Sequence, residues 1–317
     1  MKNLLKTSLI VFIALGVVSC SNDDDSNSEP QSNTISDFVA SNEDYSSLKT
    51  ALDKAGLTET LAGEGSFTVF APNNAAFSTF LAANGFADLD EVPTALLTNV
   101  LLNHVIVGVN MASDFTTGYI NTLATETSAA AYLSIYVNTS SGLKLNGISS
   151  VTNADVERDN GVIHAVNSVL GLPTVVTFAT ADPTFTTLVA ALTRDDQPDY
   201  VTVLSTSGSN PAPFTVFAPT NDAFSDLLLE LGVSSLDDID SQTLTATLNT
   251  HVIAGANVRA ENLVSGPVNT LGDTIEVDAT NATLTDPNGR ISTIIVVNVQ
   301  AANGVVHVID KVLLPLL

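Results

Sequence analysis

The sequence is poor in the side chains from which many binding and catalytic sites are built. Its 317 residues include a single cysteine, Cys20, no tryptophan, and only 6% aromatic residues. A lone cysteine cannot form an internal disulfide, and it cannot supply the thiolate pairs of a zinc site. Most aromatic residues stand at core-like positions, such as Phe67, Phe70 and Phe77, which disfavours the exposed aromatic platforms of sugar-binding sites.

Basic residues are also scarce. Lysine and arginine together number 10, against 34 aspartates and glutamates, so the formal net charge is -24. A nucleic-acid-binding protein must neutralise phosphates with basic side chains, so nucleic acid is excluded as a partner. Hydrophobic residues make up 45% of the chain and charged residues 14%, a composition that excludes a disordered protein. The length predicts about two domains.

Recognisable catalytic motifs are missing as well. The sequence contains no Gly-x-Ser-x-Gly nucleophile elbow, no His-Glu-x-x-His zinc motif and no phosphate-binding glycine loop. We therefore predict a protein that is not an enzyme, with no catalytic residues, no metal and no cofactor.

Residues 1–19 have the pattern of a secretory signal peptide. Two lysines precede an apolar run from Leu9 to Val18, and the small residue Ser19 stands before Cys20. The run is too short for a membrane-spanning helix, which needs about 20 apolar residues. The four residues Val17–Cys20 resemble the lipobox of bacterial lipoproteins, in which the cysteine is acylated. We predict lipidation of Cys20 and contact with a membrane through this lipid; the alternative is a soluble exported protein with an incidental cysteine.

Residues 20–33 predict an acidic, flexible tether. From Ser21 to Asn33 the segment contains no apolar residue, so it cannot bury a core. Residues 1–19 carry two of the ten basic residues, so their removal leaves eight against 34 acidic residues and a net charge of -26. Asp23 to Asp25 resemble the surface-export signal of lipoproteins from the Bacteroidetes group, which would place the protein on the outer face of the outer membrane. The other interpretation is a solvated charged linker.

Long segments of the chain occur twice, in the same order. The matching pairs are Phe67–Phe77 with Phe214–Phe224, His104–Ile106 with His251–Ile253, and Asn160–His164 with Asn303–His307. The offset between matching residues rises from 140 near Thr34 to 147 at Phe67, which predicts a seven-residue insertion within residues 193–213. We expect two tandem domains, copy one at residues 34–172 and copy two at residues 174–317.

Each copy begins with helical patterns and ends with strand patterns. Apolar residues at helical spacing run from Tyr45 to Ala55 and stop at Gly56, and Asp182 before Pro183 is a good start for a helix. A further helix is predicted over residues 93–103. Strands are predicted over residues 67–71, 274–279, 282–286, 291–299 and 304–314. Helices first and strands last predict an α+β domain.

The repeated segments resemble the fasciclin-like domain family. The family's two sequence boxes are found as Thr68–Phe77 with Thr215–Phe224, and as Asn160–Leu170 with Asn303–Leu313. The resemblance covers Thr34 to the C-terminus and implies, for each copy, a wedge-like β-sandwich of about seven strands capped by helices. It also implies an extracellular or surface-anchored adhesion module that binds proteins or glycans.

All four histidines fall in the repeated segments. His164 and His307 lie on strands that are apolar on both faces, so we expect them to be buried, neutral and hydrogen-bonded to backbone. A metal-binding or acid–base role would need two histidines to converge with a carboxylate. His104 and His251 each end a helix at the entry to a strand, where we expect a nearby surface.

The resemblance links the segment around His104 and His251 to cell adhesion. Family members have a tyrosine directly before this histidine, and its absence here argues against receptor binding of the animal type. We predict partner contacts at these two corners and, next, at the loops after Pro72 and Pro219. The candidate binding residues are Asn103, His104, Thr250, His251, Asn73 and Asn221.

Three acidic or polar segments have two interpretations each. The cluster Asp237, Asp238 and Asp240 has the oxygens that calcium prefers, but the stronger interpretation is that Asp240 or Ser241 caps the next helix. Residues 286–289 are expected to form a turn. Residues 273–275 resemble the O-glycosylation triplet of Bacteroidetes, with Thr274 as the acceptor.

The leading functional hypothesis is a lipid-anchored, non-enzymatic surface protein that contacts a cell-surface or matrix protein or a glycan through tandem fasciclin-like domains. The alternative is a glycan-capture lipoprotein of an outer-membrane nutrient-uptake system. A third hypothesis, a hydrolase without a recognised motif, lacks a nucleophile and base that converge.

Overall fold

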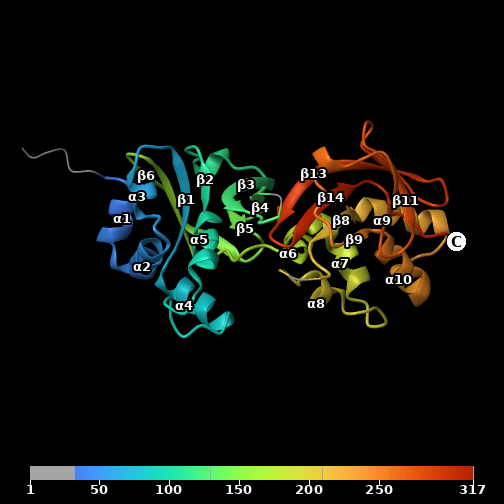
Figure 1. Ribbon diagram of the computed structural model, residues 1–317, viewed down its shortest axis with the longest axis horizontal. Coiled ribbons are helices and arrows are strands. Elements are labelled where there is room, and N and C mark those ends of the chain that lie inside the picture. The colour runs from blue at the N-terminus through green and yellow to red at the C-terminus, as the bar shows by residue number, and fades with distance from the viewer. Residues whose placement is uncertain (1–32, 129, 209, 317) are drawn as a thin grey trace, which may run out of the picture. The chain divides into compact units, whose positions relative to one another are not determined.

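The computed structural model describes residues 33–128, 130–208 and 210–316. The predicted signal peptide, Cys20 and the predicted tether as far as Ser32 lie outside the described residues, so lipidation stays a prediction. From Asn33 onward the chain forms one compact unit. This unit contains two seven-stranded sheets, one from each copy of the repeat (Figure 1).

Copy one places its helices before most of its strands. The helices are α1 (Ile35–Ser41), α2 (Ser46–Ala55), α3 (Thr58–Ala62), α4 (Asn74–Ala83) and α5 (Thr94–Leu102). The strands are β1 (Phe67–Pro72), β2 (Val105–Val107), β3 (Gly118–Thr125), β4 (Tyr132–Asn138), β5 (Lys144–Leu145), β6 (Ser149–Arg158) and β7 (Gly161–Val166). The sheet order is β2-β1-β7-β6-β5-β4-β3, in which β1 and β7 are parallel and the other pairs antiparallel.

Copy two repeats this arrangement. Its helices are α6 (Val175–Ala181), α7 (Thr186–Leu192), α8 (Tyr200–Leu204), α9 (Asn221–Leu231) and α10 (Ser241–Thr250). Its strands are β8 (Phe214–Pro219), β9 (Val252–Ala254), β10 (Gly266–Asn269), β11 (Thr274–Asp278), β12 (Thr283–Thr285), β13 (Ile291–Ala301) and β14 (Gly304–Ile309). The order is β10-β11-β12-β13-β14-β8-β9, again with one parallel pair, β8 and β14.

Two helix boundaries lie where the sequence predicts them. Gly56 ends α2 in the left-handed conformation at φ 68°, which a residue without a Cβ adopts without strain. Asp182 accepts a hydrogen bond from the backbone N–H of Thr184 and starts a 3₁₀ turn, Pro183–Phe185, that leads into α7. The α+β class with two tandem domains is confirmed.

The predicted insertion is divided by helix α8. Asn160 and Asn303 donate to the carbonyls of Leu61 and Leu204, so these two leucines are equivalent at an offset of 143. The offset is 140 at the start of α1 and α6, and 147 at the start of β1 and β8. Three of the seven extra residues therefore precede α8 and four follow it.

None of the described helices is long and apolar enough to cross a membrane alone. By length and composition only, the pair Val175–Ala181 and Pro183–Leu192 passes the same test together, with a bend of 95° between them.

Candidate functional site

The corner at the end of α5 holds His104 inside the protein. Its Nδ1–H donates to the carbonyl of Val100 at 2.8 Å, and its Nε2 accepts from the backbone N–H of Leu170 at 2.8 Å. His104 is only 2% exposed, and this burial lowers the pKa of its side chain to about 4. Because one ring nitrogen must donate and the other must accept, the ring is neutral and its tautomer is set by the backbone.

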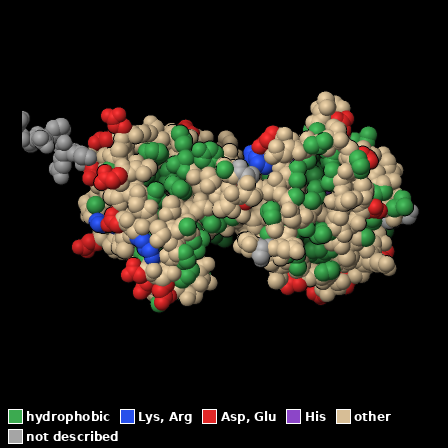
Figure 2. All heavy atoms as spheres, in the orientation of Figure 1, with side chains coloured by type: hydrophobic (Ala, Val, Ile, Leu, Met, Phe, Trp, Pro, Cys, Tyr) green, Lys and Arg blue, Asp and Glu red, His purple; other side chains and the backbone are tan. Residues whose placement is uncertain are grey.

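His251 repeats this arrangement in copy two. Its Nδ1–H donates to the carbonyl of Thr247 at 2.8 Å, and its Nε2 accepts from the N–H of Leu313 at 2.9 Å. Burial again lowers the pKa to about 4. Each histidine therefore joins a helix end to the segment that follows the last strand of its copy. The space-filling view shows no histidine on the face in view (Figure 2).

The expectation that these corners lie at a surface is wrong. Asn103 and Thr250 are 0% exposed, and His251 is 3% exposed. The Asn103 amide donates to the carbonyl of Gly171 at 3.0 Å, and the Thr250 hydroxyl donates to the carbonyl of Ala246 at 2.9 Å. The physical reason is that a distant segment covers each corner, which the local pattern of a helix followed by a strand does not reveal. A direct contact role for these side chains would require the corner to open.

His164 and His307 are buried and hydrogen-bonded to backbone, as predicted. Nε2 of His164 donates to the carbonyl of Asn110, and Nε2 of His307 donates to the carbonyl of Val258, each at 2.9 Å. The Nδ1 atoms accept from the backbone N–H of Asp155 (3.2 Å) and Asn298 (3.4 Å). Burial lowers the pKa of His307.

The acceptor geometry of these two histidines depends on a bulge in the neighbouring strand. Asp155 and Asn298 have φ 59° and 60°, in the left-handed region, where aspartate and asparagine are better tolerated than other side chains. Their side chains accept from the N–H of Ala112 and Ala260, each at 2.7 Å. The bulge and the histidine are thus one structural device, present once in each copy.

The two candidate asparagines are not equivalent residues. Asn73 caps α4 by accepting from the N–H of Ala76 at 2.9 Å, and the residue in its place in copy two is Thr220, which caps α9. Asn221 instead accepts from the N–H of Thr187 at 2.9 Å and donates to the carbonyl of Pro183 at 2.9 Å. Both asparagines are half-buried, and their described hydrogen bonds are structural.

The acidic segments form caps and turns. Asp240 caps α10 by accepting from the N–H of Thr243 at 3.0 Å, and Asp286 accepts from the N–H groups of Asn288 and Arg290 in the predicted turn. Within residues 33–128, 130–208 and 210–316, no three histidine, cysteine or acidic side chains are placed to hold a metal ion. Thr274 lies exposed in β11, and its hydroxyl donates to Asn269 at 2.8 Å.

The two copies contact each other through polar and aromatic groups that the sequence did not single out. The backbone N–H of Gln300 donates to the Ser134 hydroxyl at 3.0 Å, and both residues are buried. Asn257 donates to the carboxylate of Glu126 at 3.1 Å. Tyr136 of β4 is 2% exposed because it packs with the apolar core of copy two. The junction is therefore a packed interface.

A groove of about 630 Å³ runs beside this interface, and we call it the junction groove. Most of its lining comes from copy one, namely α4, α5, the segment after β3 and residues 168–172, and copy two contributes Thr174, Ser207 and Ala302. Its lining includes Phe80, Asn84, Glu126, Ile148, Ser207 and Ala302. Ile148 is 59% exposed at this groove, so an apolar side chain faces solvent there. Such concave sites with mixed lining, at the meeting of two domains, commonly bind partners.

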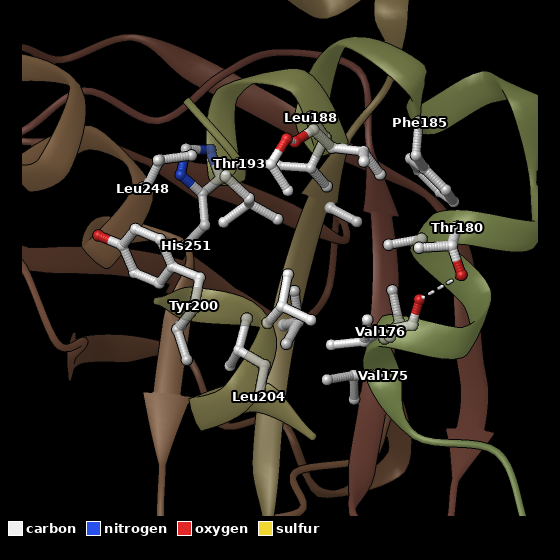
Figure 3. Close-up of a pocket in the computed structure, with 18 of the residues that line it drawn as sticks. Val175, Val176, Thr180, Phe185, Leu188, Thr193, Tyr200, Leu204, Leu248 and His251 are labelled. Atoms are coloured by element: carbon white, nitrogen blue, oxygen red, sulfur yellow. Dashed lines mark hydrogen bonds between the residues drawn. The ribbon is translucent and has the colours of Figure 1, made fainter. Parts of the chain in front are cut away.

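A second cavity, the α6–α8 pocket, lies within copy two and has a volume of about 80 Å³. Side chains from α6, α7 and α8 surround it, with Tyr200 and His251 at one end (Figure 3). Its floor is formed by β8 and β14. No short sequence motif indicates this pocket. The sequence indicates it only through residues that differ between the two copies at matching positions.

Comparison with known proteins agrees with this architecture. The fasciclin domain model matches residues 43–173 and again residues 183–315. Protein sll1483 of Synechocystis is 39% identical over 144 residues, which cover 45% of this chain and 73% of that protein. The transforming growth factor-beta-induced protein ig-h3 of Sus scrofa is 31% identical over 268 residues, which cover 80% of this chain and 35% of ig-h3.

A solved structure shows the same fold as a pair. It is a FAS1 domain pair from the insect cell adhesion molecule fasciclin I, with a TM-score of 0.51 and 19% identity. The match covers 86% of this chain and 97% of that chain, so both domains of the pair take part.

Proposed function

Because this chain belongs to the fasciclin domain family and carries the domain twice, we propose that it is a non-enzymatic adhesion protein of the cell surface. The observation that carries the proposal is the tandem repeat of the whole domain. Fasciclin I, described as an insect cell adhesion molecule, contains a pair with the same fold. Two linked copies raise avidity by effective concentration without any new contact.

The junction groove is the contact surface that we propose for the partner. Part of its lining is accessible, above all Ile148, which is 59% exposed, unlike the buried corners at His104 and His251, and the groove offers both apolar and polar groups. The face in Figure 2 carries many acidic side chains and few basic ones, in keeping with the net charge of -24. This charge disfavours anionic partners at low salt, so a protein surface or a neutral glycan is the better partner.

Attachment to the membrane is the second part of the proposal. The pattern ending at Cys20 supports lipidation, and Asp23–Asp25 support display on the outer face of the outer membrane, as in surface lipoproteins of the Bacteroidetes type. A single lipid chain gives only marginal membrane binding, so a stable anchor needs more than one chain at Cys20.

Adhesion of the folded ectodomain tests this proposal. The segment from Ser21 to the C-terminus is immobilised, and binding of whole cells and of a glycan array is measured. We expect Ile148→Glu to abolish binding because it places a charge in the junction groove. Leu229→Glu is the matched control, since Leu229 is 79% exposed on α9 and lies away from the groove lining.

The outcomes separate the partner classes. Binding to cells but not to glycans identifies a protein partner, and binding to neutral glycans on the array identifies a glycan. Equal loss of binding in both variants would show that any added negative charge reduces binding. The contact surface could then no longer be assigned to the junction groove. Turnover of a substrate by the ectodomain would overturn the non-enzymatic function.

A further inference from the structure

The α6–α8 pocket exists in copy two, and its counterpart in copy one is nearly closed. Five lining residues of the copy-one cavity match lining residues of the pocket, but that cavity has a volume of about 10 Å³, against about 80 Å³ in copy two. A single buried water needs about 10–15 Å³ on this scale, and an apolar cavity of about 150 Å³ holds benzene. The pocket in copy two is therefore large enough for part of an apolar ligand.

Smaller side chains on α6 open the pocket. Ile35 and Val175 are equivalent, because each donates its backbone N–H to the matching asparagine at 2.9 Å. One turn later, Val39 of copy one is replaced by Ala179, and both Val175 and Ala179 line the pocket. Copy two thus lacks methyl groups that copy one buries at 0% and 2% exposure.

The missing volume uncovers residues that copy one buries. Val69 on β1 is 3% exposed, but its equivalent Val216 on β8 is half-buried at the floor of the pocket. Leu52 is likewise 3% exposed, whereas the equivalent Leu192 is half-buried.

The rim of the pocket is also more apolar than in copy one. Val176 replaces Ser36, and Val189 replaces Lys49. Val201, which is 42% exposed, replaces Thr58. Valine thus replaces a polar residue at each of these three accessible positions, which adds apolar area that faces solvent at the pocket.

Polar groups on the wall have partners inside the protein. The Tyr200 hydroxyl donates to Asn249 at 3.0 Å, and both ring nitrogens of His251 bond to backbone. The hydroxyls of Thr180 and Thr193 donate to the carbonyls of Val176 (3.0 Å, dashed in Figure 3) and Val189 (2.8 Å). With its hydrogen bonds made internally, the wall favours a ligand without polar groups.

We propose that the α6–α8 pocket binds the end of an uncharged hydrocarbon chain, such as the acyl tail of a neutral lipid. A slender chain fits a small cavity with an apolar rim, since the tail end fills the cavity and the following methylenes lie on the valines. The loop after α7 carries Asp195, Asp196 and Asp199, and Arg194 is paired with Asp196 at 2.7 Å. This charge disfavours a carboxylate head near the pocket. The proposal does not depend on lipidation of Cys20 or on adhesion.

The test compares ligands of one chain length on the ectodomain from Ser21 onward. Decanol, decanoate and phosphatidylcholine vesicles are titrated while the methyl NMR signals of Val175, Val216 and Leu192 are followed. We expect saturable shifts with decanol, at least tenfold weaker binding of decanoate, and a rise in Tm with decanol concentration. A response to vesicles but not to decanol would also support the proposal, and it would identify the bound hydrocarbon chain as that of a bilayer lipid.

Variants that exchange residues between the copies make the test specific. Val175→Ile with Ala179→Val restores the copy-one side chains and should weaken decanol binding at least tenfold. The reciprocal pair, Ile35→Val with Val39→Ala, should create a second decanol site in copy one. If the filled variant does not fold, Val189→Lys changes only the rim and should weaken binding several-fold with Tm unchanged. The proposal is overturned if neither decanol nor vesicles shift the methyl signals of the pocket. It is also overturned if the Val189→Lys variant and the Val175→Ile/Ala179→Val variant both bind decanol as tightly as the parent protein.

Discussion

The Tyr119 hydroxyl of β3 donates a hydrogen bond to the carboxylate of Asp182 at 2.8 Å, and so joins copy one to the start of the helical region of copy two. Asp182 is buried and Tyr119 is half-buried, and burial, followed by the charge of Asp182, raises the pKa of Tyr119. The Tyr119 ring also meets Phe178 of α6 edge-on, with ring centroids 5.6 Å apart. One side chain thus makes polar and aromatic contacts across the junction.

Removing this hydroxyl should weaken the junction. Tyr119→Phe removes one hydrogen-bond donor from the buried carboxylate of Asp182, which costs about 1–3 kcal/mol of unfolding free energy. Urea unfolding of the ectodomain measures this change. Tyr132→Phe is the control, because Tyr132 is 54% exposed and a change there stays within about 0.5 kcal/mol. Equal stability of Tyr119→Phe and the parent protein would show that the bond contributes nothing net.

Separating the copies should reduce the stability of copy two. Residues 34–172 and 174–317, expressed alone, are each expected to fold, since each contains a complete sheet. Copy two alone lacks Tyr136 on its core and the bond from Tyr119, together worth roughly 2–5 kcal/mol. Its urea midpoint should lie below that of the same sheet in the tandem protein. Identical midpoints would mean that the two copies are energetically independent.

Stability should fall as the pH decreases from about 6.5 to about 4. The folded-state pKa of His104 and of His251 is lowered to about 4, so in this window the unfolded chain binds protons that the folded protein does not. Each histidine then lowers the free energy of unfolding by up to about 1.4 kcal/mol for each pH unit of decrease. Above the unfolded-state pKa of about 6.5, the stabilising contribution of each histidine is fully present. Urea unfolding at several pH values measures the slope.

A variant with both histidines replaced by glutamine isolates this effect. The double variant His104→Gln/His251→Gln should be less stable at pH 7 but should show a shallower decline between pH 6.5 and 4. An unchanged slope would assign the acid sensitivity to other groups, of which His307 is one, since its pKa is also lowered.

The bulge histidines are expected to be structural. His164→Ala removes a donor to the carbonyl of Asn110 and an acceptor for the N–H of Asp155, both in a partly buried setting, at a cost of about 1–3 kcal/mol plus a cavity term. His307→Ala should cost a similar amount in copy two. Thermal unfolding and adhesion are measured together; full stability with lost adhesion would contradict a structural role.

Membrane attachment should depend on Cys20. Mass spectrometry of the native N-terminus is expected to find acyl groups on this cysteine, and Cys20→Ala should move the protein from the membrane fraction to the soluble fraction. Replacing Asp23–Asp25 with alanine serves as the comparison, since it should leave lipidation intact and reduce access of external protease in whole cells. An unmodified cysteine would remove the anchor from the proposed function.

Local features of the fold were predictable because they depend on neighbouring residues. The cap at Asp182, the stop at Gly56 and the turn at residues 286–289 each follow from backbone preferences within a few positions. Burial of His164 was predictable for a similar reason, since alternation along one strand shows which residues have apolar neighbours.

The candidate site was less predictable, because its exposure depends on segments far apart in the chain. Sequence pattern placed His104 at the end of a helix, but the segment at Leu170, 66 residues further on, covers it. The junction groove and the bond from Tyr119 to Asp182 need both copies in contact. The signals for the α6–α8 pocket, such as Ala179 in place of Val39, gain meaning only when packing shows that nothing else fills the space.

The sequence by itself determined the repeat, the α+β class, the caps and the burial of the core histidines, because hydrophobic periodicity and short-range hydrogen bonding specify these. Tertiary structure alone decided which corners are covered, where the two copies touch and which cavity stays open. Those outcomes depend on side-chain volume and on contacts between residues separated by tens of positions, and a linear pattern does not contain the distances between them.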